Sequence, residues 1–310
     1  MNTHLLEPDR FSLKALASLQ SLGDVSYGED HDKLLQAEVL FVRLGNKINQ
    51  TFIECYCPKV KYVLSPTTGH DHLEIEYFEK KGIHLISLRG EYDFLSSISS
   101  TAEHTWALLL AMLRNLSPAG KHVIEGGWDR DLFIGNTLKG KKLGILGYGR
   151  VGKQVAIYAK AFGMEVHIFD TSEVAIPEGI INHLDFEEFA TQVEILSVHI
   201  PMTEANQNWL NTERLNLLNS GVKLVNTSRG GVWDEDAVAQ LVRSGFLSAV
   251  ATDVLRDELS AEERVNSALL KCAQDGFPVI ITPHIAGACF ESMHATEEYV
   301  VEKLLKQIYE

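Results

Sequence analysis

Three glycines at positions 147, 149 and 152 form the first pattern with a chemical use. The motif Gly147-Tyr-Gly149-Arg-Val-Gly152 follows a short apolar run, LGIL, and precedes an apolar helical pattern. In such a strand–turn–helix unit the first glycine permits the tight turn, the second lets the backbone approach a pyrophosphate, and the third lets the helix pack on the strand. The N–H groups at the helix start would then hold the phosphates. The motif therefore predicts a dinucleotide-binding site.

An acidic residue stands where the next predicted strand ends. Asp170 lies 18 residues after Gly152. A carboxylate there accepts hydrogen bonds from the adenosine ribose hydroxyls and repels a 2′-phosphate, so we predict NAD rather than NADP. The alternative is an ordinary glycine-rich turn followed by a chance acid. The flanking strand and helix patterns favour the cofactor site.

Three further polar groups follow predicted strands. Arg229, in the segment NTSRGG (226–231), would point into the crevice beyond parallel strands, where a guanidinium suits a carboxylate. His284, in TPHIAG (282–287), is the type of side chain best able to move a proton near neutral pH. A carboxylate from the acidic segment 253–258 would orient the ring and favour its protonated form. Taken singly, each has a structural alternative: a surface arginine, a structural histidine and a solvated acidic loop.

The elements that must position these groups alternate along the chain. Apolar runs of four or five residues, rich in Val, Ile and Leu, are typical of strands buried on both faces of a sheet. Helix-like patterns such as 152–162 and 234–244 lie between them. The alternation predicts an α/β fold with parallel sheets. The predicted strands are 38–42, 60–64, 83–86, 143–146, 166–169, 194–198, 222–226, 249–253 and 279–282.

One long apolar segment, 100–116, interrupts this rhythm and contains neither Pro nor Gly. We interpret it as a buried helix that bridges two domains. The following segment, 117–140, is rich in glycine and has the composition of a linker. The segment 291–310 is predicted to form one more amphipathic helix.

The composition limits the kinds of protein that this chain can be. With 310 residues, 45% of them hydrophobic, the chain is long enough for two globular domains. The 42 acidic residues outnumber the 28 Lys and Arg, and the net charge of −14 argues against nucleic-acid and membrane partners. The four cysteines lack metal-site spacing, so we predict free, buried or half-buried thiols and no metal. No signal peptide or membrane span is apparent, and a cytoplasmic location is expected.

Taken in order, these motifs resemble those of the D-isomer-specific 2-hydroxyacid dehydrogenases, the family of D-3-phosphoglycerate dehydrogenase. The resemblance covers residues 38–294, with matching segments VR (42–43), TGHDHL (68–73), AEHT (102–105), HIP (199–201), NTSRGG and PHIAG (283–287), besides the glycine motif. This chain departs from the family pattern in three places. Leu259 follows Glu258 where the family has proline, Leu44 stands in place of serine, and segment 87–98 is longer.

The resemblance implies an NAD-binding Rossmann domain over 105–285, inserted in a discontinuous, flavodoxin-like substrate domain of residues 1–104 and 286–310. The active site would lie between them, and the protein would form a homodimer through the 100–116 helix. Hydride transfer between NAD and a 2-hydroxy acid would involve Arg229 on the substrate carboxylate, His284 as the proton carrier and Glu258 as its partner. The implied NAD contacts are Gly147, Gly149, Arg150, Val151, Gly152, Asp170, His199, Pro201, Thr227 and Asp253.

The substrate is expected to be 3-phosphoglycerate or a similar phosphorylated acid. A 4-phosphoerythronate, glycerate or lactate dehydrogenase is the alternative. Glu258 argues against formate, because formate dehydrogenases of the family have Gln there. The NAD-sensing corepressors that share the fold are an alternative of another class. The substrate side would include Arg43, Leu44, Gly69 and Arg89 as well as Arg229.

Overall fold

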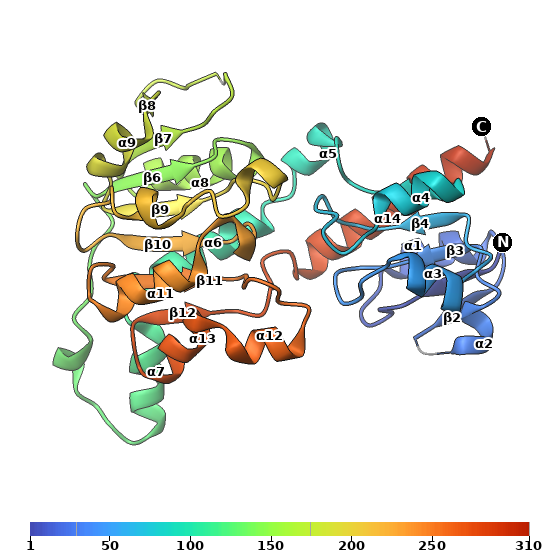
Figure 1. Ribbon diagram of the computed structural model, residues 1–310, viewed down its shortest axis with the longest axis horizontal. Coiled ribbons are helices and arrows are strands. Elements are labelled where there is room, and N and C mark those ends of the chain that lie inside the picture. Colours follow the sequence, from blue (N-terminus) through green and yellow to red (C-terminus); the bar gives the residue numbers. More distant parts are fainter. Residues whose placement is uncertain (29, 174, 310) are drawn as a thin grey trace. The chain divides into compact units, whose positions relative to one another are not determined.

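The computed structural model describes residues 1–28, 30–173 and 175–309, and they form two compact units (Figure 1). Unit 1 comprises Met1–Ile98 and the C-terminal segment from Ala288, and unit 2 comprises Ser99–Gly287. Each unit is a parallel sheet covered by helices on both faces. The predicted fold, α/β with two Rossmann-like domains, is confirmed. Glu310, the end of the predicted 286–310 segment, lies outside the described residues.

Unit 1 is built on a five-stranded sheet with the order β2-β1-β3-β4-β5. Apolar residues of α1 and α14 pack on one face of the sheet, and those of α3 and α4 pack on the other. Its strands are β1 Thr3–Leu5, β2 Val25–Tyr27, β3 Val39–Phe41, β4 Tyr62–Leu64 and β5 His84–Ile86, and its helices are α1 Leu13–Gln20, α2 His31–Leu34, α3 Gln50–Tyr56, α4 Ile75–Lys81, α5 Tyr92–Ser96 and α14 Phe290–Tyr309.

Unit 2 is built on a seven-stranded parallel sheet with the order β12-β11-β10-β9-β6-β7-β8. The order reverses between β6 and β9, which is the place where doubly wound sheets bind ligands. Its strands are β6 Lys142–Leu146, β7 Glu165–Phe169, β8 Ile180–His183, β9 Ile195–Val198, β10 Lys223–Asn226, β11 Ala249–Thr252 and β12 Val279–Ile281. Its α-helices are α6 Ser100–Leu113, α7 Leu116–Ile124, α8 Arg150–Ala161, α9 Phe186–Gln192, α10 Thr212–Leu215, α11 Glu235–Arg243, α12 Ala261–Asn266 and α13 Ala268–Gln274, with short 3-10 turns at Arg130–Phe133, Glu204–Asn206 and Gly230–Val232.

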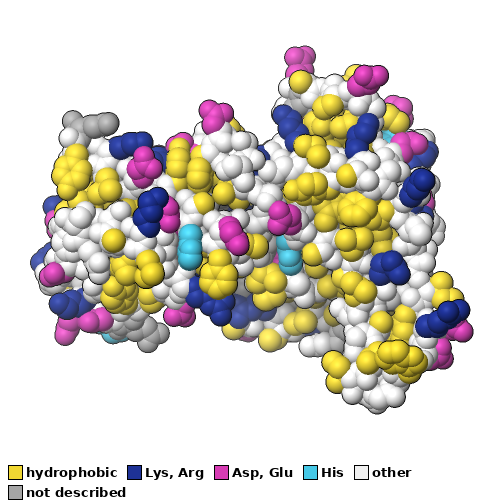
Figure 2. Space-filling view, turned by 180° about the vertical axis from the view of Figure 1, so that it is seen from behind, with side chains coloured by type: hydrophobic (Ala, Val, Ile, Leu, Met, Phe, Trp, Pro, Cys, Tyr) yellow, Lys and Arg dark blue, Asp and Glu magenta, His cyan; other side chains and the backbone are white. Residues whose placement is uncertain are grey.

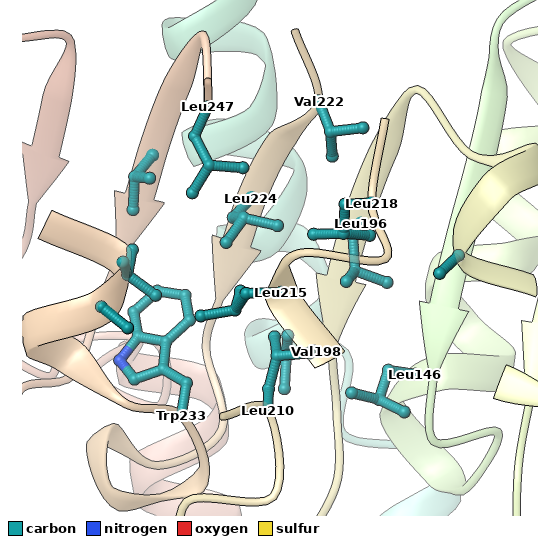
Figure 3. Packing of buried hydrophobic residues seen from close by; sticks show 14 of the residues in the cluster. Leu146, Leu196, Val198, Leu210, Leu215, Leu218, Val222, Leu224, Trp233 and Leu247 are labelled. Atoms are coloured by element: carbon teal, nitrogen blue, oxygen red, sulfur yellow. The ribbon is translucent and has the colours of Figure 1, made fainter. Parts of the chain in front are cut away.

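The core of unit 2 has two layers, one on each side of its sheet. Helices α6 and α8 cover one face, and α9, α10, α11 and α13 cover the other. Trp233, which is fully buried, lies beside Leu210 and Leu215 in the second layer (Figure 3). Side-chain caps start several of these helices: Asp185, for example, accepts from the N–H of Glu188 at the start of α9.

Some details of the fold differ from the prediction. The predicted boundary at 104/105 falls inside α6, most of whose apolar residues pack within unit 2, and the chain passes between the units at Ile98 and Ser99. The predicted linker 117–140 contains most of α7, and the lengthened segment 87–98 contains α5. Strands β1, β2 and β8 were not predicted. All four cysteines are free, but Cys55 is exposed rather than buried.

Candidate active site

The three candidate catalytic residues follow three neighbouring strands of unit 2. Arg229 comes after β10, Glu258 after β11 and His284 after β12, and these strands lie side by side in the sheet. Because all three strands are parallel, their carboxyl ends lie at the same edge. Residues that are up to 55 positions apart in the chain thus reach one edge of the sheet.

His284 and Glu258 form a hydrogen-bonded ion pair between Nδ1 of the ring and Oε1 of the carboxylate. The other carboxylate oxygen, Oε2, accepts from the backbone N–H of Leu255 at 3.1 Å. The side chains of His284 and Glu258 are 24% and 25% exposed, so a substrate can reach the pair. Since Nδ1 is occupied by the carboxylate, Nε2 is the ring atom left to exchange a proton with a substrate.

The backbone of His284 adopts an uncommon conformation with φ of 54°. Asp253 holds it there: its carbonyl accepts from His284 N–H at 2.8 Å, and its carboxylate accepts from the N–H groups of Ile285 at 2.9 Å and Ala286 at 2.7 Å. The side chain of Asp253 is 0% exposed. In the structure this residue therefore positions the histidine loop, and its predicted contact with the nicotinamide stays a prediction.

His104, to which the sequence analysis assigned no role, joins the same network. Its Nε2 lies 3.0 Å from the hydroxyl of Thr282 and 3.3 Å from the carboxylate of Asp253. The next residue, Thr105, shares a 2.7 Å hydrogen bond with Thr227. The AEHT segment thus links α6 to the loops that carry the candidate catalytic residues. The match of AEHT to the family pattern was the one signal for this role.

A tight turn after β10 presents Arg229. Asn226, which is fully buried, accepts from the N–H and hydroxyl of Ser228 and donates its amide to the Arg229 carbonyl. The next residue, Gly230, packs so closely that a Cβ there would lie 2.1 Å from the carbonyl carbon of Leu255. The loops after β10 and β11 are therefore in direct contact.

The glycine motif has the geometry that its sequence predicts. Gly147 has φ of 93°, and a Cβ on Gly152 would lie 2.2 Å from the Gly147 carbonyl oxygen, so helix and turn need glycine at both places. Around Gly149 no atom lies within 4 Å of a Cβ position, which leaves space beside the N-terminus of α8. Asp170 accepts from the N–H groups of Tyr148 and Ser172. An open glycine turn, a helix start and an acid fit a dinucleotide.

His199 follows β9, next to this turn. Its carbonyl oxygen would lie 2.9 Å from a Cβ on Gly147, and its ring nitrogen Nε2 lies 2.7 Å from the Ser197 hydroxyl. Desolvation by burial lowers the pKa of His199 to about 3. The ring is therefore neutral at pH 7, and His199 does not compete with His284 as the proton carrier. Pro201, the other residue predicted in this segment, is exposed.

The predicted substrate residues of unit 1 have different environments. Arg43 forms an ion pair with Glu297, whose side chain is 1% exposed, and donates to the Asp9 carbonyl at 2.9 Å. These contacts fix α14 to the loop after β3 and give Arg43 a structural role, and its predicted contact with the substrate stays a prediction. The side chain of Arg89 is exposed and makes no hydrogen bond to a described residue. The other two predicted residues, Leu44 and Gly69, are half-buried.

Comparisons with known proteins add a family context. Residues 106–286 match the family model "D-isomer specific 2-hydroxyacid dehydrogenase, NAD binding domain". D-3-phosphoglycerate dehydrogenase of Bacillus subtilis is 32% identical over 278 residues, which are 89% of this chain and 50% of that protein. Hydroxypyruvate reductase of Thermotoga maritima is 30% identical, over 98% of this chain and 97% of its own. The chain thus spans half the length of the first relative and nearly all of the second.

The fold also matches solved structures. D-Lactate dehydrogenase from Aquifex aeolicus, in a complex with NAD and lactic acid, is 27% identical with a TM-score of 0.79, covering 99% of this chain and 95% of that one. None of the helices in the described part of the chain combines the length and apolar character that crossing a bilayer requires. Among the described residues, no three His, Cys, Asp or Glu side chains gather into a group that could hold a metal ion.

Proposed function

Because this chain belongs to the D-isomer-specific 2-hydroxyacid dehydrogenase family, we propose that it catalyses reversible hydride transfer between NAD and C2 of a 2-hydroxy or 2-keto acid. The observation that carries the proposal is the ion pair of His284 and Glu258 at the sheet edge that also presents Arg229. Bound NAD would supply the hydride acceptor, and NADH the donor.

Each of the three side chains has a role that follows from its chemistry. The guanidinium of Arg229 binds the substrate carboxylate and polarises the C2 oxygen. Nε2 of His284 accepts the hydroxyl proton when the hydroxy acid is oxidised and returns it when the keto acid is reduced. Glu258, held on the opposite ring nitrogen, keeps the ring oriented and stabilises its protonated form.

The residues that would hold NAD are those of the glycine turn and of the neighbouring strand ends. The N–H groups at the start of α8 would bind the pyrophosphate. Asp170 would accept hydrogen bonds from the ribose diol and repel a 2′-phosphate. His199 borders the same turn, Pro201 follows it two positions later in the chain, and Thr227 begins the loop that carries Arg229.

For the substrate, we propose 3-phosphoglycerate or a similar phosphorylated acid first, because D-3-phosphoglycerate dehydrogenases recur among the relatives. The exposed guanidinium of Arg89, one of the predicted substrate residues, would suit a phosphate and supports this choice. Hydroxypyruvate is the second candidate, because the relative that matches this chain over nearly its whole length is named hydroxypyruvate reductase. The exclusion of formate rests on Glu258.

The deciding experiment is NADH oxidation with phosphohydroxypyruvate, hydroxypyruvate, glyoxylate and pyruvate, together with NAD reduction by 4-phosphoerythronate. We expect one substrate to exceed the others in kcat/KM by at least tenfold. Tight NADH binding with slow turnover of every acid would instead favour an NAD-sensing protein. Turnover of NADPH at the same rate would contradict the cofactor assignment.

We also propose a homodimer, and we locate its interface next to the predicted helix. Most apolar residues of α6 are buried within unit 2, although Ala107 is exposed and Leu110 and Ala111 are half-buried, so α6 by itself offers little apolar surface to a second chain. Large hydrophobic side chains are instead exposed in α7 and the segment after it, which protrude from unit 2 (Figures 1 and 2). Their exposed fractions are high for single-chain surfaces: Leu116 56%, Val123 49%, Ile124 88%, Trp128 88%, Leu132 64% and Ile134 78%.

A second copy of this chain is the proposed occupant, since a two-fold contact would cover the same patch on both copies at once. Light scattering at micromolar concentration should give twice the chain mass for the native protein and the chain mass for Ile124→Glu. Ile157→Glu, at an exposed apolar position of α8, is the matched control and should stay dimeric. A native monomer would refute the proposal. The proposed location stays cytoplasmic, which the four free thiols support.

A further inference from the structure

Two loops that carry candidate catalytic residues meet at one peptide group, between Leu255 and Arg256. A Cβ on Gly230, the neighbour of Arg229, would lie 2.1 Å from the Leu255 carbonyl carbon and 2.4 Å from Arg256 N. The adjoining peptide group contacts the catalytic acid, because the N–H of Leu255 donates to Oε2 of Glu258 at 3.1 Å. The position of this segment therefore sets where Glu258 lies relative to Arg229.

A buried carboxylate holds the same peptide group. Glu235, the first residue of α11, is 1% exposed. Its Oε2 accepts from the N–H of Arg256 at 2.9 Å, and its Oε1 accepts from the hydroxyl of Ser267 at 2.6 Å. Ser267 is the residue that caps α13. One side chain thus connects the start of α11, the loop after β11 and the start of α13.

Burying a carboxylate is unfavourable unless its oxygens are hydrogen-bonded, and a well-packed apolar side chain often stabilises such a place as well or better. Stability alone therefore gives little reason for an acid here. The hydrogen bond to Arg256 gives a specific reason for an acid at this position, because it fixes a backbone group two residues before Glu258.

We propose that Glu235 is a positioning residue for the reaction. By holding the Leu255–Arg256 peptide group against Gly230, it keeps Glu258 paired with His284 and at a constant distance from Arg229. Glu235 touches neither substrate nor cofactor in this role and acts through Glu258. The inference rests on the proposed function of Arg229, Glu258 and His284.

The test compares two substitutions at one position. Glu235→Met keeps the volume but removes both acceptors. Glu235→Gln keeps an acceptor oxygen for Arg256 N–H, while its NH2 group can donate to the Ser267 hydroxyl oxygen. For Glu235→Met we expect kcat for keto-acid reduction to fall about ten- to a hundredfold, because small displacements of catalytic groups have effects of this size. The KM for NADH should stay within about twofold, and Glu235→Gln should recover most of the loss.

The pH profile separates positioning from simple destabilisation. When Glu258 is displaced, the protonated ring of His284 loses its partner, so the pH above which reduction declines should move lower in Glu235→Met. Two controls share the local chemistry. Ser267→Ala removes the other partner of Glu235, and Asp236→Asn alters the adjacent acid, which accepts from the Arg256 guanidinium at 3.1 Å and not from its backbone N–H. Both should keep the native kcat and pH profile.

Three results would each overturn the proposal. The first is a Glu235→Met protein with lowered melting temperature but native kcat and pH profile, and the second is a Ser267→Ala protein that loses as much kcat as Glu235→Met. The third needs no turnover: in Glu235→Met, an unchanged NMR signal of the His284 Nδ1 proton, which lies in the hydrogen bond to Glu258. Native protein inactive toward every acid would instead refute the proposed function.

Discussion

Replacing Asp253 with asparagine tests what holds His284 in its backbone conformation. The Asp253 carboxylate accepts hydrogen bonds from the hydroxyl of Thr282 and from the backbone N–H groups of Ile285 and Ala286. Asparagine has the same shape, but one of its two terminal groups is an NH2 donor. At least one donor of the loop would therefore lose its acceptor and face another donor, inside a site that water does not reach.

The size of the effect follows from these contacts. A buried polar group left without its partner costs about 1–3 kcal/mol, so we expect the free energy of unfolding to fall by that amount. The left-handed conformation of His284, with φ of 54°, costs about 1–2 kcal/mol for a residue with a Cβ. The stabilisation lost with one hydrogen bond is thus similar to the cost of the left-handed conformation. The weakened loop should therefore relax and displace the His284 ring. We expect kcat to fall about ten- to a hundredfold.

Denaturant unfolding and steady-state kinetics of Asp253→Asn would measure both effects. The matched control is Asp257→Asn, which changes an exposed acid of the same loop and should alter neither. If Asp253→Asn keeps its stability and kcat and only raises the KM for NADH, the carboxylate contacts the cofactor and does not hold the loop. That result would refute the reasoning from the hydrogen bonds.

Three further substitutions test the site. His284→Ala should lower turnover about 10²- to 10⁴-fold with NADH affinity unchanged by fluorescence titration, and a loss below about tenfold would remove its role as proton carrier. Asp170→Ala should reduce the preference for NAD over NADP by about 1–3 kcal/mol in competition kinetics; a native preference for NADPH would contradict the assignment. Desolvation by burial lowers the pKa of His199 from its ordinary value of 6.5 to about 3 in the folded protein, so the unfolded chain binds a proton that the folded chain does not as pH falls below 6.5. The free energy of unfolding of the native protein should therefore fall by about 2 kcal/mol between pH 7 and 5 because of His199. His199→Asn should show a fall that is smaller by this amount. Equal falls for the two proteins in denaturant titrations would exclude this role of His199.

The sequence by itself determined the fold class and indicated where the site would lie. Strands buried on both faces are continuous apolar runs, so all nine runs that we identified, including 143–146 before the glycine motif, coincide with strands of the structure. Polar residues after such runs lie at one sheet edge when the strands are parallel, which places Arg229, His284 and the acidic segment 253–258 together. Within that segment, only the family resemblance singled out Glu258. Strands β1, β2 and β8, with the sequences THL, VSY and IINH, escaped prediction because polar residues interrupt them and leave no continuous apolar run.

Only the tertiary structure decided which groups hold that site in place. Glu235 contacts Arg256, 21 positions away, and Arg43 contacts Glu297, 254 positions away, and no local pattern marks either pair. The same holds for burial: the apolar α6 proved to be covered inside unit 2, while the glycine-rich segment after it carries exposed hydrophobic side chains. Periodicity and turn residues report each element's own conformation. Which side chain packs on which partner depends on how distant elements meet, and this is decided when the sheet and its helices assemble.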